Sequence, residues 1–538
     1  MGYQSIFEQY ADYAKAVNIY IKEYISYLEN CKKAAHNITY CSNLENISQL
    51  SFFELTSTAK RQCREILDEI NRRSKESELF MPFDYICNAL AIPQDDRLGI
   101  IAGFLPCIFP NMSDLFRPLN RYETTAWLTI ADFGRIFLYG KAERLYSAEK
   151  TYLPMLFEIH NGILKPLERI RSLLVDMELI YNPVYGKSFS AIEKIDEIYG
   201  RQQELEQITA LAALKNPTVI QIIGEQGSGK TFLARHAARL CRRNLISVDM
   251  SLLSSTKIEE LIIECKRECI LQKSYLCITN MTEAQAEQAD RLAADLLETS
   301  HLVFVCTDEG INLNKSEPFR LHLKELDFQS RLKLWSGFSM PTAEDVNLQT
   351  FADIYRFPPA KICKITAECD LRCKLSNTKV ITNEQIESVC LESSEKILKD
   401  KAVRIITPFK LSDLILPEEE KQQIREGMAH IRYQHRVYDN WGFSQKITYG
   451  RGLSMLFEGS PGTGKTMAAS IFGNELGLPV LKVDLSKLMS KYIGETEKNL
   501  GEIFDAAQKA TPYSFLMKQM QFFLSVQKLR TVMISMPM

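Results

Sequence analysis

The sequence lacks the cysteine and histidine patterns that mark disulfide or metal scaffolds. Its 14 cysteines include no C-x-x-C pair, and its 7 histidines do not cluster near Cys265/Cys269 or Cys369/Cys373, which stand at i,i+4 spacing. These cysteines are most simply small buried thiols, with metal ligation as the alternative. No H-E-x-x-H segment occurs, so a fused zinc protease is disfavoured. The cysteine usage is typical of a reducing, intracellular compartment.

Long apolar runs and an excess of one charge are also missing. The longest apolar run, Leu98 to Pro110, covers 13 residues, whereas a membrane-spanning helix needs about 20. The N-terminus lacks the basic start and apolar stretch of a signal peptide. The 65 basic and 67 acidic residues leave a net charge of −2, which argues against a nucleic-acid protein held by bulk positive charge. We therefore expect a cytoplasmic protein without membrane contact, with nucleic acid a disfavoured partner.

A length of 538 residues predicts several compact units, since one domain usually has about 100–200 residues. Apolar spacing of three and four residues, for example over 57–73 and 153–179, predicts a mostly helical N-terminal region. From Tyr199 short apolar runs alternate with helical patterns, which indicates an α/β fold with parallel sheets. A linker follows near Leu416-Pro417. The predicted units are helical 1–78, helical 79–190 with linker helices, and two α/β modules at 195–402 and 410–512.

Two segments match the phosphate-loop pattern G-x-x-x-x-G-K-[ST], each between a strand-like run and a helix-like one. A merely glycine-rich turn is the alternative, but one such match arises by chance in roughly one chain of this length in fifty. Glycines let backbone N–H groups surround a β-phosphate, and the following helix adds its positive end. The residues of the two loops are Gly224, Glu225, Gln226, Gly227, Ser228, Gly229, Lys230 and Thr231, and then Gly459, Ser460, Pro461, Gly462, Thr463, Gly464, Lys465 and Thr466.

These loops predict binding of ATP with Mg²⁺. Lys230 and Lys465 are the expected catalytic contacts to the β- and γ-phosphates, and the hydroxyls of Thr231 and Thr466 are the expected Mg²⁺ ligands. The loops also belong to an internal repeat. Lys230 and Lys465 are 235 residues apart, and the same separation relates Asp249 to the aspartate at 484. One plan of strands and helices is therefore used twice.

The second copy resembles the AAA family of ATPases. Its loop reads L-F-E-G-S-P-G-T-G-K-T from Leu456, and S-K-Y-I-G-E-T-E-K-N-L from Ser490 looks like the pore-loop segment of that family. The resemblance runs from about Asp413 to Ala510. It implies ATP hydrolysis on a P-loop sheet with a helical lid, a homohexameric ring, and threading of a polypeptide substrate through the pore. The implied pore-loop residues are Lys491, Tyr492, Ile493 and Gly494, of which the tyrosine and isoleucine would grip the substrate. An exposed loop with an incidental tyrosine is the alternative.

The first copy fits that family less well, although Tyr199-Gly200-Arg201 opens it like the h-G-R-x-x-E-L box of related ATPases. The strand at 274–279 should end in Asp-Glu, which would hold Mg²⁺ and activate water, but Asn280-Met281 follows. Asparagine lacks the charge, and methionine cannot accept a proton. Thr307, at the end of the next predicted strand, is a candidate sensor, and Lys361 is a candidate sensor of the lid. We predict a module that binds nucleotide and hydrolyses it poorly.

The resemblance predicts a tandem AAA-type ATPase that works as a protein-remodelling or unfolding motor. The segment from Phe80 to about Leu138 looks like the winged-helix-type region that precedes the ATPase module in some bacterial tandem ATPases. A winged helix binds DNA or protein, and the charge balance favours protein, for example an adaptor. Two alternatives stay open: a DNA-associated AAA+ protein of the initiator or loader type, and a nucleotide-switch scaffold without the acid pair.

The family pattern stops after Pro512. An apolar strand ending in Asp-Glu is due next, yet Tyr513 to Met538 contains no acidic residue. The sequence can be back-translated and read in a shifted frame, in which each new codon joins the third base of one codon to the first two bases of the next. This shifted frame permits the sequence apolar-Asp-Glu-Ala-Asp-Ala near position 516. That position follows Lys465 at about the spacing that separates the first loop from Asn280. We interpret 513–538 as an out-of-frame tail of a truncated second module, with a natural divergent tail as the alternative. Such a chain should expose an apolar sheet edge, aggregate and hydrolyse little ATP.

Overall fold

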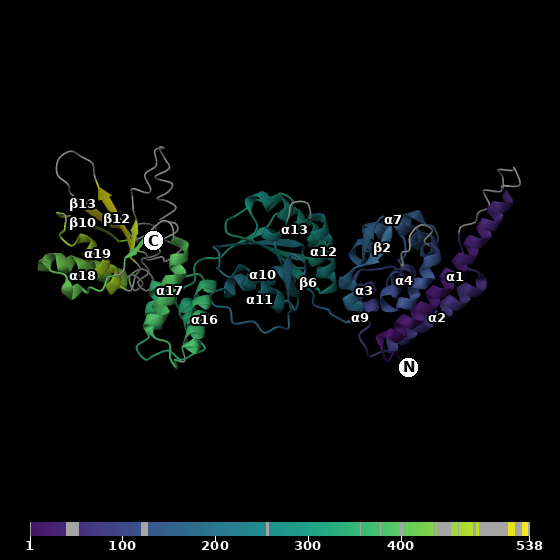
Figure 1. Ribbon diagram of the computed structural model, residues 1–538, viewed down its shortest axis with the longest axis horizontal. Helices are drawn as coiled ribbons and strands as arrows, with labels where there is room; N and C mark the ends of the chain where they lie inside the picture. The colour runs from purple at the N-terminus through teal and green to yellow at the C-terminus, as the bar shows by residue number, and fades with distance from the viewer. Residues whose placement is uncertain are drawn as a thin grey trace. The chain divides into compact units, whose positions relative to one another are not determined.

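Figure 1 shows the protein as a computed structural model. The structure describes residues 2–38, 53–119, 127–253, 258–355, 357–376, 378–398, 403–405, 407–433, 437, 453–460, 462–476, 480–483, 515–521 and 530–535. The chain forms two compact units. The first comprises Met1–Asp196, Gln203–Ile223 and Thr231–His322, and the second comprises Glu197–Gln202, Gly224–Lys230 and Leu323–Met538.

The first unit begins with two long helices, α1 (Ile6–Ile38) and α2 (Ser57–Glu76). The buried face of α1 carries Tyr10, Tyr13, Val17 and Ile21 at spacings of three and four residues, which is the pattern of a helix with one apolar stripe. Thr56 caps α2, because its side chain accepts a hydrogen bond from the N–H of Ala59.

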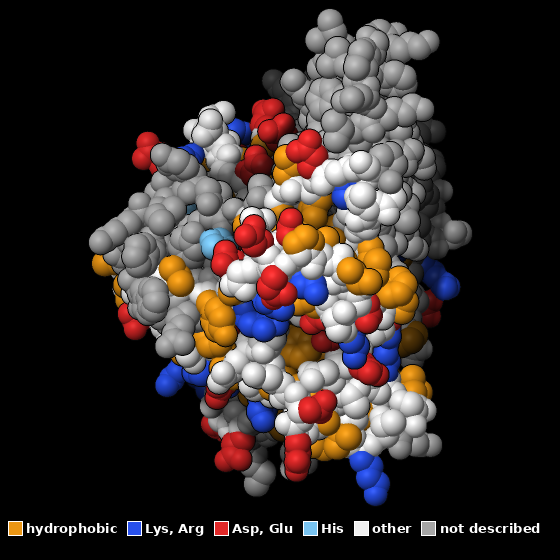
Figure 2. Space-filling model, turned by 90° about the vertical axis from the view of Figure 1, so that its left-hand side faces the viewer, with side chains coloured by type: hydrophobic (Ala, Val, Ile, Leu, Met, Phe, Trp, Pro, Cys, Tyr) orange, Lys and Arg blue, Asp and Glu red, His pale blue; other side chains and the backbone are white. Residues whose placement is uncertain are grey.

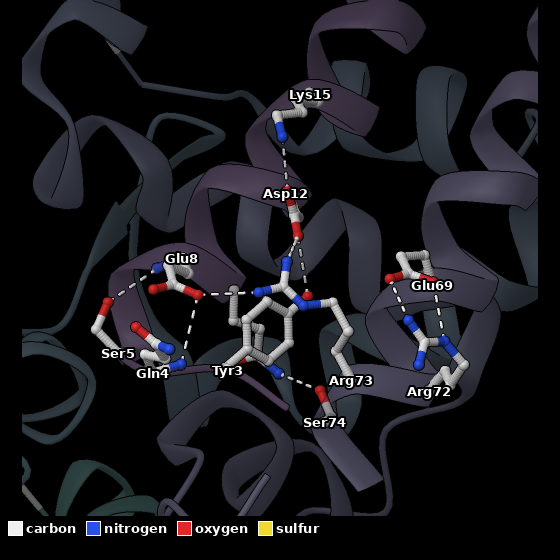
Figure 3. A network of polar contacts seen from close by, with 11 residues as sticks. Tyr3, Gln4, Ser5, Glu8, Asp12, Lys15, Glu69, Arg72, Arg73 and Ser74 are labelled. Atoms are coloured by element: carbon white, nitrogen blue, oxygen red, sulfur yellow. Dashed lines mark hydrogen bonds and ion pairs between the residues drawn. The ribbon is translucent and has the colours of Figure 1, made fainter. Parts of the chain in front are cut away.

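Polar contacts join the start of α1 to the end of α2 (Figure 3). The Arg73 guanidinium donates to Glu8 at 2.9 Å and to Asp12 at 3.0 Å, and it lies 4.1 Å from the centroid of the Tyr3 ring. The Tyr3 hydroxyl donates to Asp12 at 3.2 Å. Since Arg73 and Glu8 are partly exposed, we expect these contacts to set the helix register more than the stability.

Short helices and a β-hairpin complete the N-terminal region. They are α3 (Pro82–Ala89), α4 (Arg97–Ile108), α5 (Ser113–Phe116), α6 (Ile130–Asp132), α7 (Ala142–Lys150), α8 (Leu153–Leu156), β1 (Phe157–His160), β2 (Ile163–Pro166) and α9 (Glu168–Val175). The helix expected over 153–179 is wrong in its middle. Asn161 and Gly162 adopt φ of +50° and +77° and turn the chain into the antiparallel β1–β2 pair, as Asn-Gly does in tight hairpins.

The hairpin gains one further contact, an isolated bridge between Thr129 and Ile163. Helices followed by a hairpin suit a winged helix, and that assignment stays a prediction. Among the described residues no single helix is long and apolar enough to cross a membrane. One bent pair, Gln94–Ile108 with Pro110–Leu119, passes that test only when taken together.

A six-stranded sheet forms the rest of the first unit. Its elements are β3 (Gly186–Phe189), α10 (Gln202–Ala213), β4 (Thr218–Ile223), α11 (Lys230–Leu240), β5 (Asn244–Asp249), α12 (Ile258–Leu271), β6 (Ser274–Thr279), α13 (Ala286–Ser300), β7 (Leu302–Thr307) and β8 (Phe319–His322). The strand order is β3-β5-β6-β7-β4-β8. All pairs are parallel except β3–β5. The predicted α/β fold is confirmed, with an antiparallel strand at one edge.

The second unit contains a helical bundle and a second sheet. The helices α14 (Phe328–Trp335), α15 (Leu348–Ile354), α16 (Pro359–Leu375) and α17 (Asn383–Leu398) enclose a core around the fully buried Trp335. The sheet and its helices are β9 (Val403–Ile405), α18 (Glu418–Arg432), β10 (Ser454–Phe457), α19 (Lys465–Glu475), β11 (Val480–Val483), β12 (Phe515–Gln521) and β13 (Arg530–Ser535).

The second sheet has the order β10-β13-β12-β11-β9. Counted from the strand before each phosphate loop, this order corresponds to β4-β7-β6-β5-β3 of the first sheet. In both sheets the last of these strands is antiparallel to its neighbour. The sheets differ at β13, which runs antiparallel to both neighbours, whereas β7 is parallel. The out-of-frame tail at 513–538 stays a prediction, and its two described strands lie within this sheet.

Candidate nucleotide-binding site

The first phosphate loop leaves β4 after Ile223 and enters α11 at Lys230. Gly227 and Gly229 adopt φ of +84° and +94°, which only glycine adopts without strain. A Cβ atom on Gly229 would meet nothing within 4 Å, so the glycine is required by conformation rather than by space. The Lys230 ammonium donates to the carbonyl oxygens of Gly224 and Glu225, the second at 3.0 Å.

The second loop repeats this geometry. Gly462 and Gly464 adopt φ of +86° and +82° with open space at their Cβ positions. The Lys465 ammonium donates to the carbonyl oxygens of Gly459 at 3.0 Å and Ser460 at 2.7 Å. Both lysines therefore hold a positive charge over their own loop, and their contact with phosphates stays a prediction. Of the remaining predicted residues, Thr231 and Thr466 are second in α11 and α19, and Pro461 lies outside the described residues.

A small cavity of about 170 Å³ adjoins the first loop. Its lining residues are Arg201, Glu225, Ser228, Leu323, Lys324, Glu325, Leu326, Arg331, Pro358 and Pro359. The Ser228 hydroxyl is buried and has no hydrogen-bond partner among the described residues. Such a group calls for a ligand or water. Glycines with positive φ, a lysine over the loop and this hydroxyl fit a nucleoside polyphosphate.

The Gly200-Arg201 segment that opens the module contributes to the lining of this cavity. Gly200 adopts φ of +64°, and a Cβ atom there would lie 2.6 Å from the Ser330 hydroxyl oxygen. Arg201 is buried and donates to the carbonyl oxygen of Lys324 at 2.6 Å. Gly200 and Arg201 therefore hold the segment after β8 against the loop, a role that the sequence pattern alone did not reveal.

The start of α16 also touches the loop. The Ala360 N–H donates to the Gly227 carbonyl oxygen at 3.1 Å, and the Lys361 ammonium lies 3.7 Å from the centroid of the Phe357 ring. Burial lowers the pKa of Lys361 to about 8, against the opposing effects of Cys390 and Glu225. The lysine singled out as a lid sensor thus carries its charge close to Glu225 of the loop.

At the carboxyl edge of the six-stranded sheet, the position expected for an acid holds an amide. Asn280 adopts φ of +52°, and its side-chain N–H donates to Asp249 at 2.7 Å. Partial burial acts to raise the pKa of Asp249, but hydrogen bonds from Ser251 and Asn280 outweigh burial and hold it below its usual value. Sequence reasoning missed this pair, although both residues end or follow adjacent parallel strands.

Thr307, the candidate sensor, ends β7 and pairs with Ile223, the residue before the loop. Its hydroxyl is buried, and no described residue forms a hydrogen bond with it. The pore-loop residues Lys491, Tyr492, Ile493 and Gly494 lie outside the described residues. Among the described residues no group of three or more His, Cys, Asp or Glu side chains could hold a metal ion.

Comparison with known proteins finds a similarity to one family in part of the chain. The ATPase family associated with various cellular activities (AAA) matches residues 455–519. The match spans the second loop and extends through most of β12, so it includes the first residues of the predicted tail. The chain is therefore similar to the AAA family in this segment.

Three curated relatives are similar to parts of the chain. An uncharacterized AAA family ATPase, y4kL, of Sinorhizobium fredii is 53% identical over 118 residues, 20% of this chain and 36% of the relative. A cell division cycle protein 48 homolog of Archaeoglobus fulgidus is 24% identical over 392 residues, 65% of this chain and 52% of the relative. A 26S proteasome regulatory subunit homolog of Methanothermobacter marburgensis is 26% identical over 217 residues, 40% of this chain and 50% of the relative. The chain therefore spans between about a third and a half of each relative.

Proposed function

We propose that the protein is a tandem AAA-type ATPase that binds ATP with Mg²⁺ at both phosphate loops and works in a ring as a protein-remodelling motor. The observation that carries the proposal is the matching geometry of the two loops, with Lys230 and Lys465 each held over its own loop carbonyls. The names of the cell division cycle and proteasome relatives support remodelling of protein substrates.

Each loop contributes the same functions. When bound, the nucleotide supplies a γ-phosphoryl group whose transfer to water drives the motor. Backbone N–H groups freed by the positive-φ glycines bind the phosphates, and Lys230 or Lys465 neutralises their charge. Thr231 and Thr466 offer hydroxyls to Mg²⁺. In the first module Thr307 and Lys361 are the proposed sensors of the phosphate state.

We infer that hydrolysis in the first module is slow. Asn280 stands where the acid that holds Mg²⁺ is expected, but its uncharged amide donates a hydrogen bond to Asp249. Met281 stands where a general base must accept a proton. Met281 offers no acceptor. This observation also favours a second candidate function, a nucleotide switch in which the first module holds ATP as a structural ligand.

The partners proposed for the motor are a polypeptide substrate gripped by Tyr492 and Ile493, further copies of the chain in a homohexamer, and adaptor proteins at the N-terminal region. A DNA partner is less well supported. On the face shown in Figure 2, the Lys and Arg side chains of the described residues are interspersed with Asp and Glu rather than gathered in a basic patch. Salt-dependent DNA binding or DNA-stimulated hydrolysis would favour the initiator-type alternative.

Nucleotide binding by single-loop variants tests the proposal. The Lys230→Ala and Lys465→Ala variants should each lose one of two ATP sites, and the double variant should lose both. Binding by the double variant with unchanged affinity would contradict the assignment of the loops.

A further inference from the structure

A buried ion network joins the N-terminal region to the first ATPase sheet. Glu268, on α12, is fully buried and accepts hydrogen bonds from Arg169 of α9 at 3.1 Å, Arg267 at 2.9 Å and Gln272 at 2.9 Å. Buried charges of this kind persist only when they are paired. Between α9 and β3 runs a linker, residues 176–185, which passes directly over this network.

The network also holds the backbone of the linker. Arg169 donates through its two terminal nitrogens to the carbonyl oxygens of Glu178 at 2.6 Å and Leu179 at 3.0 Å. Gln272 donates to the carbonyl oxygen of Tyr181 at 2.9 Å, and the Arg169 guanidinium lies 4.9 Å from the centroid of the Tyr181 ring. One arginine thus binds the α12 carboxylate and two linker carbonyls, a fork geometry that lysine cannot reproduce.

From there, hydrogen bonds lead to the position of the missing acid. The Val184 N–H donates to Glu264 of α12 at 3.2 Å. The carbonyl oxygen of Tyr185, the last residue of the linker, accepts from the Asp249 N–H at 2.8 Å. The Asp249 carboxylate in turn accepts from Asn280 at 2.7 Å. Every step lies within the first unit.

We propose that Arg169 is a positioning residue and that the linker 176–185 is a coupling strap. When the strap is hydrogen-bonded to Arg169 and α12, it holds Asp249 and Asn280 in place at the carboxyl edge of the sheet. When these contacts are broken, the carboxyl edge of the sheet can rearrange. A partner that shifts the N-terminal region then changes the nucleotide affinity of the first module, and nucleotide binding changes partner affinity by the same factor. The nucleotide part of this inference rests on the proposed function.

The experiment compares two arginines of α9 in the full chain. Arg169→Met removes the buried fork, whereas Arg171→Met removes an exposed contact with Glu168 on the same helix. Both are made with Lys465→Ala, so that only the first loop binds nucleotide. The readouts are amide hydrogen exchange over 176–189 and 244–249 without nucleotide, and the affinity for ADP. The double variant Arg169→Met/Glu268→Gln removes both buried charges. It is included because Arg169→Met alone leaves Glu268 without this partner, and the chain could then fail to fold.

Release of the strap should speed amide exchange over 176–189 at least about tenfold, and change ADP affinity by about fivefold or more. The Arg171→Met variant should match the parent in both readouts, and Arg169→Lys should fall between them. Faster exchange with unchanged ADP affinity would overturn the coupling and leave Arg169 a purely structural residue. Unchanged exchange in both Arg169→Met variants would overturn the strap itself. A Lys465→Ala parent that binds no ADP would instead contradict the proposed function, and the coupling would fall with it.

Discussion

The two phosphate loops are nearly the same in conformation, but the sheets that carry them differ. Both loops place glycines at positive φ and fold a lysine over two loop carbonyls. In the first sheet the strand beside β4 is parallel, whereas the strand beside β10 is antiparallel. The loop conformation therefore follows from the loop's own residues and not from the direction of the neighbouring strand.

The largest expected effect is loss of the first site in Lys230→Ala. Without the ammonium the phosphate charge is not neutralised, and we expect affinity for ATP at that loop to fall at least about 100-fold, or about 2.7 kcal/mol. Titration of the Lys465→Ala chain with and without Lys230→Ala measures this. Lys194→Ala, which replaces an exposed lysine outside the loop, is the control. Equal affinity in the Lys230→Ala chain would show that this loop is not a nucleotide site.

In an intact assembly, Tyr492→Ala should spare ATP binding yet stop substrate processing, because the proposed function assigns the tyrosine side chain to gripping the polypeptide and the phosphate contacts to the loops. The measurement is unfolding of a fluorescent protein substrate beside nucleotide binding. Tyr492→Phe, which keeps the ring, should retain most of the processing. Processing by Tyr492→Ala at the parent rate would remove the pore-loop assignment.

Asn280→Asp should not restore hydrolysis to the first module. A carboxylate at 280 would face Asp249 where an N–H now donates at 2.7 Å, so a hydrogen bond becomes a repulsion. We expect a loss of about 0.5–1.5 kcal/mol in the free energy of unfolding, measured by denaturant titration. Asn312→Asp is the matched control, since Asn312 accepts from Arg320 and a carboxylate there should be neutral or stabilising. A gain in ATP turnover in Asn280→Asp would contradict this account of the first module.

The smallest expected effect is a pH dependence from Lys361. Its pKa of about 8 means that the positive charge near Glu225 is lost as pH rises from 7 to 9, and ADP affinity at the first loop should fall over that range. An unfolded lysine titrates near about 10.4, so the folded state binds fewer protons between these values and stability rises with pH. Weaker binding would then not reflect unfolding. Lys361→Met should bind ADP with an affinity that is flat from pH 7 to 9, and a slope equal to that of the parent would exclude Lys361 as its source.

The phosphate loops and the alternation of strands and helices could be predicted from the sequence, because both follow from local rules. The glycine spacing fixes the loop, and apolar strands alternating with helices fix the parallel sheet. Sequence reasoning misjudged 153–179, because apolar spacing outweighed the Asn161-Gly162 turn signal. It could not find the Arg169–Glu268 pair, since the two residues are 99 positions apart and only the tertiary fold of the first unit brings them together.

The central claim is that the first module holds ATP without turning it over, and the most direct test is to follow the fate of one bound nucleotide. The Lys465→Ala chain is loaded with radiolabelled ATP and Mg²⁺, separated from free nucleotide, and sampled for ATP and ADP over an hour. The account predicts up to one nucleotide per chain, still mostly ATP at the end. Conversion to ADP at a rate typical of the family, near about 1 per second, would contradict it.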